Sequence, residues 1–257
     1  MNLKEIRDEA WSMAREVGDA DDNRYWTTKD MNRYINRVYR FIARETRCIR
    51  DAVTPAVCRI PVVPPVSQAA LELAAATNPL YAIDLEEYND PSSWMYNQLV
   101  APRIFPLSPL ILDIDEAKWK SAPWRLTKVS VSKWQNNPYW EKVIGYPTEF
   151  CTDYTNGAIA LNYRTTQTDT LLMVVRRLPL TDLAKDTDIP ELRVNYHDMM
   201  LNGILAQMYQ KQDIETFNLA KAADYAALYK ADIDEIKKQE NILDQRLKPT
   251  QSLDAFR

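Results

Sequence analysis

The spacing of apolar residues changes twice along this chain, and these changes most constrain its fold. Near the N-terminus, apolar residues recur every three or four positions, at Met31, Tyr34, Ile35, Val38, Phe41 and Ile42. The same spacing returns late in the chain, at His197, Met200, Leu201, Ile204, Leu205 and Met208. Stretches between them, such as residues 126–134, alternate with period two. The sequence therefore predicts helical ends around a strand-rich middle.

Local signals set the boundaries of the N-terminal helices. A first helix over residues 3–17 is expected to end at Gly18, because glycine is favoured just past the last helical turn. Thr27 is a good cap for the second helix, with Asp30 three residues on, as in a capping box. We expect that helix to end near Cys48.

The C-terminal helices have weaker boundaries. Pro190 and Glu191 predict the start of the third helix, because proline and an acidic residue are favoured in a first turn. A break at 213–218 separates it from a last helix, which carries Ala222, Tyr225, Ala226, Tyr229, Ile233 and Ile236. Beyond Gln239 the helical pattern fades.

Strand signals fill the middle of the chain. Residues 57–63 predict an edge strand, because Pro61 cannot donate a hydrogen bond to a ladder. The continuous apolar run of residues 171–175 predicts a strand buried on both faces. Asn156 and Gly157 lie between two candidate strands and predict a hairpin turn.

Together these elements predict an α+β fold. Residues 1–56 and 180–239 are expected to form an antiparallel four-helix bundle, with two helices from each end of the chain. Residues 57–179 are expected to form a mainly antiparallel β insertion domain. Residues 240–257 are expected to form an extended C-terminal arm.

Composition argues against several classes of protein. A net charge of −4 disfavours a protein that wraps nucleic acid tightly, because such binding needs a basic surface. The four glycines include no pair close enough to build a phosphate-cradling loop. Cys48, Cys58 and Cys151 are odd in number and widely spaced, so we expect reduced thiols. We expect neither a signal peptide nor a membrane span.

No catalytic, cofactor or metal site is predicted. His197, the only histidine, lies on the apolar stripe without a nearby nucleophile, so a histidine packed in the core or at an interface is expected. The run Asp113-Ile114-Asp115-Glu116 offers carboxylates to calcium, but it lacks the spaced ligands and the glycine of a calcium loop. A solvated turn is the favoured interpretation of that run. We therefore expect a protein that is not an enzyme.

Arginines of the second helix are candidates for contacts between subunits. They follow at steps of three or four, opposite the apolar stripe, at Arg33, Arg37, Arg40, Arg44, Arg47 and Arg50. A solvated face or ion pairs with a neighbouring subunit is favoured over contact with phosphate. Among them, Arg37 and Arg44 are assigned to a subunit or tail interface.

Aromatic residues crowd the proline-rich middle of the chain, and loop aromatics are typical interface anchors. Four of them are assigned to the same subunit or tail interface: Trp94, Trp134, Tyr139 and Trp140. Carbohydrate binding by exposed aromatics is the alternative interpretation.

Both ends of the chain resemble the head-to-tail adaptor, or connector, proteins of tailed bacteriophages. In that family an early helix opens with Trp-Thr, an acidic residue and an aromatic-aliphatic-Asn run, here Trp26, Thr27, Asp30, Tyr34, Ile35 and Asn36. A Gln-Asp-x-Glu-Thr-aromatic element precedes an alanine-led helix near the C-terminus, here Gln212, Asp213, Glu215, Thr216, Phe217 and Ala220 to Ala223. The resemblance covers about residues 1–50 and 188–238, and the order of the motifs is more specific than any one of them.

The resemblance implies a structural virion protein at the head-tail junction, assembled in the host cytoplasm. It implies a ring of twelve identical subunits between the portal protein and the next tail component, a nozzle or tail tube. Double-stranded DNA would pass through the lumen without sequence readout. It also implies that the C-terminal segment docks on the portal. The spaced apolar residues of that segment, with the terminal arginine, are assigned to portal docking: Leu243, Leu247, Leu253, Phe256 and Arg257. A carbohydrate-binding or host-recognition tail module is the alternative, and an envelope-degrading hydrolase is a weaker one.

Overall fold

A computed structural model describes most of the chain, namely residues 1–14, 25–62, 103–136, 140, 145–163, 165, 168–211 and 217–247. The chain divides into two compact units. The helical unit comprises residues 1–49 and 177–257, and the sheet unit comprises residues 50–176.

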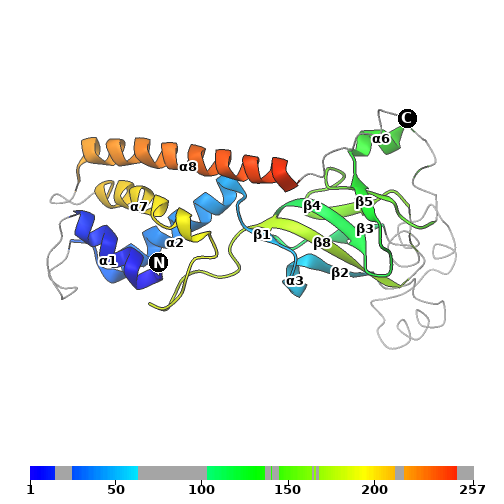
Figure 1. Cartoon of the computed structure of the whole chain (residues 1–257), viewed down its shortest axis with the longest axis horizontal. Helices are drawn as coiled ribbons and strands as arrows, with labels where there is room; N and C mark the ends of the chain where they lie inside the picture. Colours follow the sequence, from blue (N-terminus) through cyan, green and yellow to red (C-terminus); the bar gives the residue numbers. More distant parts are fainter. Residues whose placement is uncertain are drawn as a thin grey trace, which may run out of the picture. The chain divides into compact units, whose positions relative to one another are not determined.

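Four α-helices and one 3-10 turn make up the described part of the helical unit (Figure 1). They are α1 (Leu3–Ala14), α2 (Thr28–Thr46), the 3-10 turn η5 (Val194–Tyr196), α7 (Met199–Tyr209) and α8 (Leu219–Leu247). The longest helix, α8, packs on α7 and α2, while α1 packs on α2 and α7. One apolar core joins all four α-helices, so segments from both ends of the chain depend on each other for burial.

Local sequence signals account for α2. The amide of Asp30 donates to the Thr27 hydroxyl at 3.2 Å, which confirms the predicted cap. At the other end Arg47 adopts a left-handed conformation, and its amide donates to the Ala43 carbonyl. The predicted apolar stripe is buried except at Phe41, which is 38% exposed because it lies at the margin of the core against Tyr229 of α8.

A single glycine allows α7 and α8 to approach closely. A Cβ atom added at Gly203 of α7 would lie 2.8 Å from Cε2 of Tyr229 on α8. Real Cβ atoms essentially never come this close to another heavy atom. The Tyr229 ring therefore packs directly on the backbone of α7, and glycine is required for packing at this position rather than for a turn.

The described residues of the sheet unit form eight strands and two short helices. The strands are β1 (Arg50–Asp51), β2 (Arg59–Val62), β3 (Ile104–Pro106), β4 (Ile111–Trp119), β5 (Arg125–Lys128), β6 (Glu149–Cys151), β7 (Ala158–Leu161) and β8 (Asp169–Arg177). The helices are α3 (Pro55–Cys58) and α6 (Val131–Gln135). The strands lie in the order β1-β8-β4-β5-β6-β7-β3 in the sheet, and β2 is also paired to β8. The sheet is mixed, because β5 and β6 run parallel.

The predicted fold class is wrong. In place of an antiparallel four-helix bundle with a mainly antiparallel insertion, the described residues form six α-helices and a curled, eight-stranded mixed sheet, which dominates the fold. A four-helix bundle packs four nearly antiparallel helices side by side along one shared core. Here α1 and α7 have 12 and 11 residues, whereas α8 has 29 residues. Since α8 is about 44 Å long, it runs well past the short helices.

The predicted start of the third helix is also wrong. α7 begins at Met199 instead of Pro190. The carboxylate of Glu191 accepts hydrogen bonds from the Arg177 guanidinium at 2.5 Å and from the Leu180 amide at 2.8 Å. The Glu191 amide donates to the Tyr39 hydroxyl at 2.7 Å. These contacts hold Glu191 in the connection that precedes α7. Its carboxylate therefore does not lie in the first turn of a helix.

The extended arm predicted from residue 240 begins as helix, because α8 continues to Leu247. Glu240 is buried, and its carboxylate accepts a hydrogen bond from the Tyr196 hydroxyl at 2.8 Å. It also lies 3.5 Å from the Arg193 guanidinium. A buried carboxylate with these partners fixes the late turns of α8 against η5. Residues 248–257 lie outside the described residues.

Strand β8 is buried on one face only, contrary to the prediction. Leu171, Met173 and Val175 are buried, whereas Leu172 and Val174 between them are half-buried. β8 pairs antiparallel with β1 and β2, and antiparallel sheets commonly keep one face in solvent. Because Leu172 and Val174 on the second face are also apolar, the sequence alone predicted burial on both faces.

Replacing Gly203 with alanine tests the close packing of α7 on α8. The clash with Tyr229 is expected to cost about 1–3 kcal/mol, partly offset by the roughly 1 kcal/mol that alanine gains over glycine in a helix. Chemical denaturation should therefore show a net loss of stability. In a Tyr229→Leu background the same Gly203→Ala change should cost less or should stabilise, because the ring is gone. Equal costs in both backgrounds would contradict the packing described.

Candidate assembly surfaces

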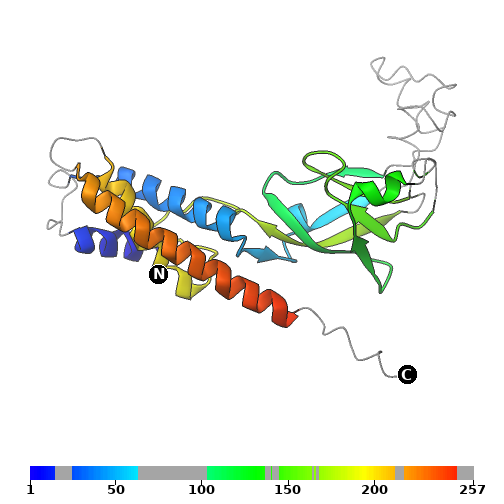
Figure 2. The ribbon, with the colours of Figure 1, turned by 90° about the horizontal axis from the view of Figure 1, so that it is seen from above.

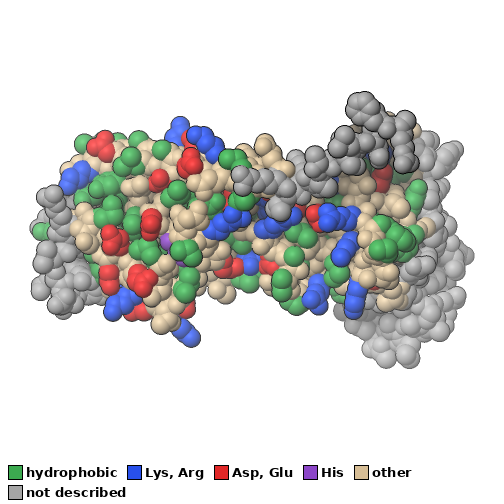
Figure 3. Space-filling model, in the orientation of Figure 1, with side chains coloured by type: hydrophobic (Ala, Val, Ile, Leu, Met, Phe, Trp, Pro, Cys, Tyr) green, Lys and Arg blue, Asp and Glu red, His purple; other side chains and the backbone are tan. Residues whose placement is uncertain are grey.

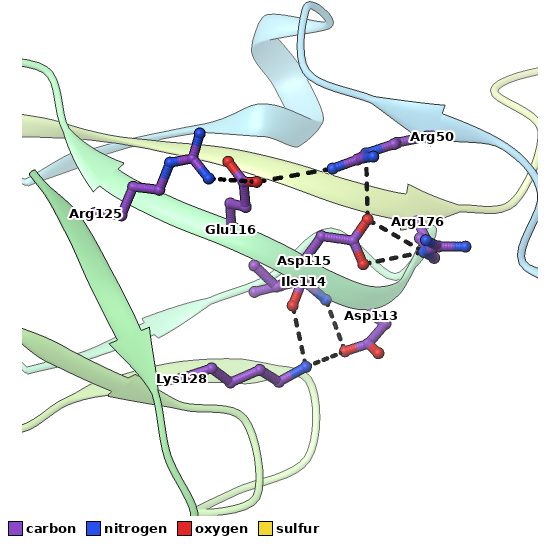
Figure 4. Close-up of polar contacts among 8 residues, drawn as sticks. All are labelled: Arg50, Asp113, Ile114, Asp115, Glu116, Arg125, Lys128 and Arg176. Carbon is purple, nitrogen blue, oxygen red and sulfur yellow. Dashed lines mark hydrogen bonds and ion pairs between the residues drawn. The ribbon is translucent and has the colours of Figure 1, made fainter. Parts of the chain in front are cut away.

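The outward face of the sheet carries a network of ion pairs (Figure 4). Asp115 of β4 is its centre. Its two carboxylate oxygens lie 3.0 and 3.2 Å from Nε of Arg176 on β8. One of them is also 3.3 Å from Nε of Arg50 on β1. The Arg176 side chain is largely buried, so Asp115 neutralises two neighbouring cations that would otherwise repel each other.

The network extends to β5 through two further ion pairs. Glu116 lies 2.8 Å from Arg125, and Asp113 lies 2.5 Å from Nζ of Lys128. Lys128 also donates to the Ile114 carbonyl at 3.0 Å. The run from Asp113 to Glu116 is thus part of a strand, and the predicted solvated turn is wrong. Ile114 is buried, while Asp113, Asp115 and Glu116 form ion pairs with arginine and lysine side chains, so the run has the burial of a strand.

Two of the predicted interface aromatics are buried within the chain. The rings of Trp134 and Trp140 lie 5.2 Å apart, centroid to centroid, and the Arg103 guanidinium stacks 4.1 Å from the Trp140 ring. Trp134 Nε1 donates to Glu149 at 2.8 Å. Burial raises the pKa of Glu149, but hydrogen bonds from Lys133 and Trp134 outweigh it, and the net shift is downward. An interface role for these two tryptophans stays a prediction.

The remaining predicted site residues have varied positions. Arg37 and Arg44 are exposed on α2, and Leu243 is half-buried on α8. Leu247 is the last residue of α8, and only its backbone is described. The other five lie outside the described residues: Trp94, Tyr139, Leu253, Phe256 and Arg257. Their predicted roles stay predictions.

The exposed aromatic residues that were not among the predicted site residues include Trp124. Trp124 precedes β5 in the hairpin from β4, and its side chain is 53% exposed. Its ring contacts Tyr146 edge-on at 5.8 Å, and Tyr146 in turn contacts the buried Trp119. An exposed ring supported by a buried one is suited to contact a partner. Pro123, directly before Trp124, is the sequence signal for this exposed position, because proline favours a turn over a strand.

His197 has a structural role. It is 1% exposed, its Nδ1 accepts a hydrogen bond from the Met1 nitrogen at 2.8 Å, and its Nε2 donates to the Leu192 carbonyl at 3.1 Å. The predicted packed position is therefore confirmed. Burial lowers the pKa of His197, which favours the neutral ring. Within the described ranges no group of three or more His, Cys, Asp or Glu residues is arranged to hold a metal ion.

Comparison with known protein families identifies the chain. A profile of the SU10 adaptor protein family matches residues 1–250. The chain belongs to this family. Comparison with curated proteins gives no match. This adaptor family gives the chain a structural role in a phage virion at the head-tail junction, and it suggests a role other than catalysis. Across the described part of this adaptor, no helix is both long and apolar enough to cross a membrane.

The lowered pKa of His197 predicts a pH dependence of stability. The neutral ring contributes its full stability above the unfolded-state pKa of about 6.5, and this contribution falls as the pH drops below that value toward the folded-state pKa. His197→Gln keeps a donor for Leu192 but cannot titrate. Thermal melts between about pH 7.5 and 5.5 should show a smaller drop in Tm for the variant. An identical drop in both proteins would contradict the assignment.

Proposed function

We propose that this adaptor is the subunit of a closed ring of twelve copies. The ring joins the portal protein to the next tail component, and double-stranded DNA passes through its lumen without sequence readout. The family match over residues 1–250 carries the proposal. A formal net charge of −4 supports weak contact with the DNA, because tight binding needs many neutralised phosphates.

Features of both units support an assembling protein. The helical unit exposes several large apolar side chains on its surface, among them Ile189, Val194, Phe217, Leu219 and Leu228. The sheet unit exposes Trp124 at a hairpin, and we assign this residue to the contact with the tail component. Burial of Trp134 and Trp140 weakens the carbohydrate-binding alternative, because a sugar needs accessible rings.

Native mass spectrometry of the purified portal complex tests the ring. The mass should correspond to twelve copies of the 29.8 kDa chain bound to the portal. The portal alone serves as the control. A stable monomer or trimer of this chain within the complex would contradict a closed ring of twelve.

The C-terminal segment from residue 240 is proposed as the portal-docking arm. α8 carries Leu243 and ends at Leu247, and the docking residues Leu253, Phe256 and Arg257 follow in the sequence. Each apolar anchor that becomes well buried on docking contributes about 1.5–3 kcal/mol.

Deleting residues 248–257 tests the arm while leaving α8 and the buried Glu240 intact. The shortened protein should unfold at the same temperature as the full chain, because the deletion removes none of the described core. It should fail to bind the portal in a pull-down experiment. A shortened chain that still joins the portal with normal occupancy would place the docking surface elsewhere on the molecule.

A further inference from the structure

The solvent side of α2 is a row of cations. Five exposed side chains follow at steps of three or four and share one face of the helix: Lys29, Arg33, Arg37, Arg40 and Arg44. The opposite face of α2 is buried in the core of the helical unit. This basic row is about 22 Å long, at 1.5 Å per residue. It is a concentrated positive surface in a chain whose net charge is negative.

Carboxylates of the same chain neutralise the basic row only in part. Arg33 lies 3.5 Å from Asp30, and Arg40 pairs with Asp182. Arg37 has no ion pair with any described residue. Arg44 reaches Glu45 only at 4.0 Å, and Glu45 also lies 3.7 Å from Lys237 of α8. Among the described residues, Arg37 and Arg44 therefore keep charge that is available to a partner.

An exposed aromatic ring lies within the basic row. Phe41 is 38% exposed, and the Arg44 guanidinium stacks 5.7 Å from its ring centre. Arginine and aromatic side chains together are enriched in the contacts between proteins, where charged residues are otherwise depleted. This mixture favours a protein partner over a nucleic-acid backbone, which would be bound by charge alone.

A complementary surface lies on α1. Its solvent side carries Glu5, Asp8 and Glu9, and its other side buries Leu3, Ile6 and Ala10. Glu5 belongs to the helix cap, since it accepts the Asn2 amide at 2.9 Å. Asp8 and Glu9 have no ion pair with any described residue. We call Glu5, Asp8 and Glu9 the acidic face.

The basic row and the acidic face point away from each other. Figure 2 shows α2 along one flank of α8 and α1 toward the other flank. Both helices turn their apolar sides to the shared core, so their charged sides face outward in different directions. Figure 3 shows acidic side chains gathered on the face of the helical unit where α1 lies in Figure 1. One chain cannot bring the two surfaces together, whereas two copies can.

We propose that the basic row on α2 of one copy docks on the acidic face on α1 of the next copy. The inference rests on the proposed ring and names the surfaces that build it. Contacts between two different surfaces of identical subunits are heterologous, and they close into a ring when the rotation permits. Complementary charges fix the register of such contacts and speed their formation.

Two charge-reversed proteins test this contact. Arg37→Glu with Arg44→Glu makes the α2 surface more acidic, and Asp8→Lys with Glu9→Lys makes the α1 surface more basic. Each protein alone then sets like charges against each other. In each case the protein concentration for half-maximal ring assembly, followed by mass photometry, should rise about tenfold or more. The parent ring should weaken as salt rises, because exposed charges are screened.

Mixing the two reversed proteins is the decisive experiment. In an alternating ring every contact again joins opposite charges, so the mixture should assemble near the parent concentration while neither protein does so alone. Lys230→Glu with Lys238→Glu on the exposed side of α8 is the matched control, and it should assemble like the parent. Thermal melts check folding, and Arg37→Gln with Arg44→Gln replaces the reversal if the glutamate variant is unfolded.

The outcomes separate this inference from the proposed function. Rings that form normally in the Arg37→Glu and Arg44→Glu protein would overturn the contact while leaving the ring intact. A mixture that fails to assemble would also overturn it. If the variant assembles normally but loses DNA retention, the basic row binds nucleic acid and the inference is wrong. If the parent protein forms no ring even with the portal, the proposed function itself fails.

Discussion

The pairing of β1 with β8 is the constraint on which the rest of the structure depends. The chain leaves the helical unit after Ile49 and returns to it at Arg177. The Arg177 amide donates to the Ile49 carbonyl at 3.0 Å, and the next pair in register joins Arg50 to Arg176. The carboxylate of Asp115 neutralises the positive charges of Arg50 and Arg176. Because the outgoing and returning strands are neighbours, helices from distant parts of the sequence share one core.

Elements whose signals lie within a few residues, such as a helix cap or an apolar stripe, were predictable from the sequence. Thr27 and Asp30 cap α2, and the stripe from Met31 to Ile42 is buried apart from Phe41, since both signals depend on residues within a few turns. Elements that depend on partners far away in the sequence were not predictable from it. Asp115 belongs to a strand because arginines from β1 and β8 neutralise it, and Glu191 is held outside a helix by Arg177 and Tyr39. No local pattern reveals such partners.

The candidate surfaces also divide into features that local sequence patterns predict and features that depend on distant parts of the chain. The periodic arginines of α2 were visible as an exposed stripe, but the opposing acidic face on α1 required the arrangement of the helices. Trp134 and Trp140 looked like loop anchors, yet Arg103 and Glu149 hold them in a buried cluster. Exposure of an aromatic ring depends on what the rest of the chain packs against it. Among the tryptophans that the structure describes in the sheet unit, Trp124, which follows a proline in a hairpin, is the exposed one.

A cryo-electron microscopy reconstruction of the head-tail junction in the intact virion tests the central claim most directly. The account predicts a twelvefold ring of this chain against the portal. It further predicts that α2 of each subunit lies against α1 of its neighbour, with Arg37 and Arg44 facing Asp8 and Glu9. A junction without density for this chain, or a ring in which α2 faces solvent on both sides, would contradict the account.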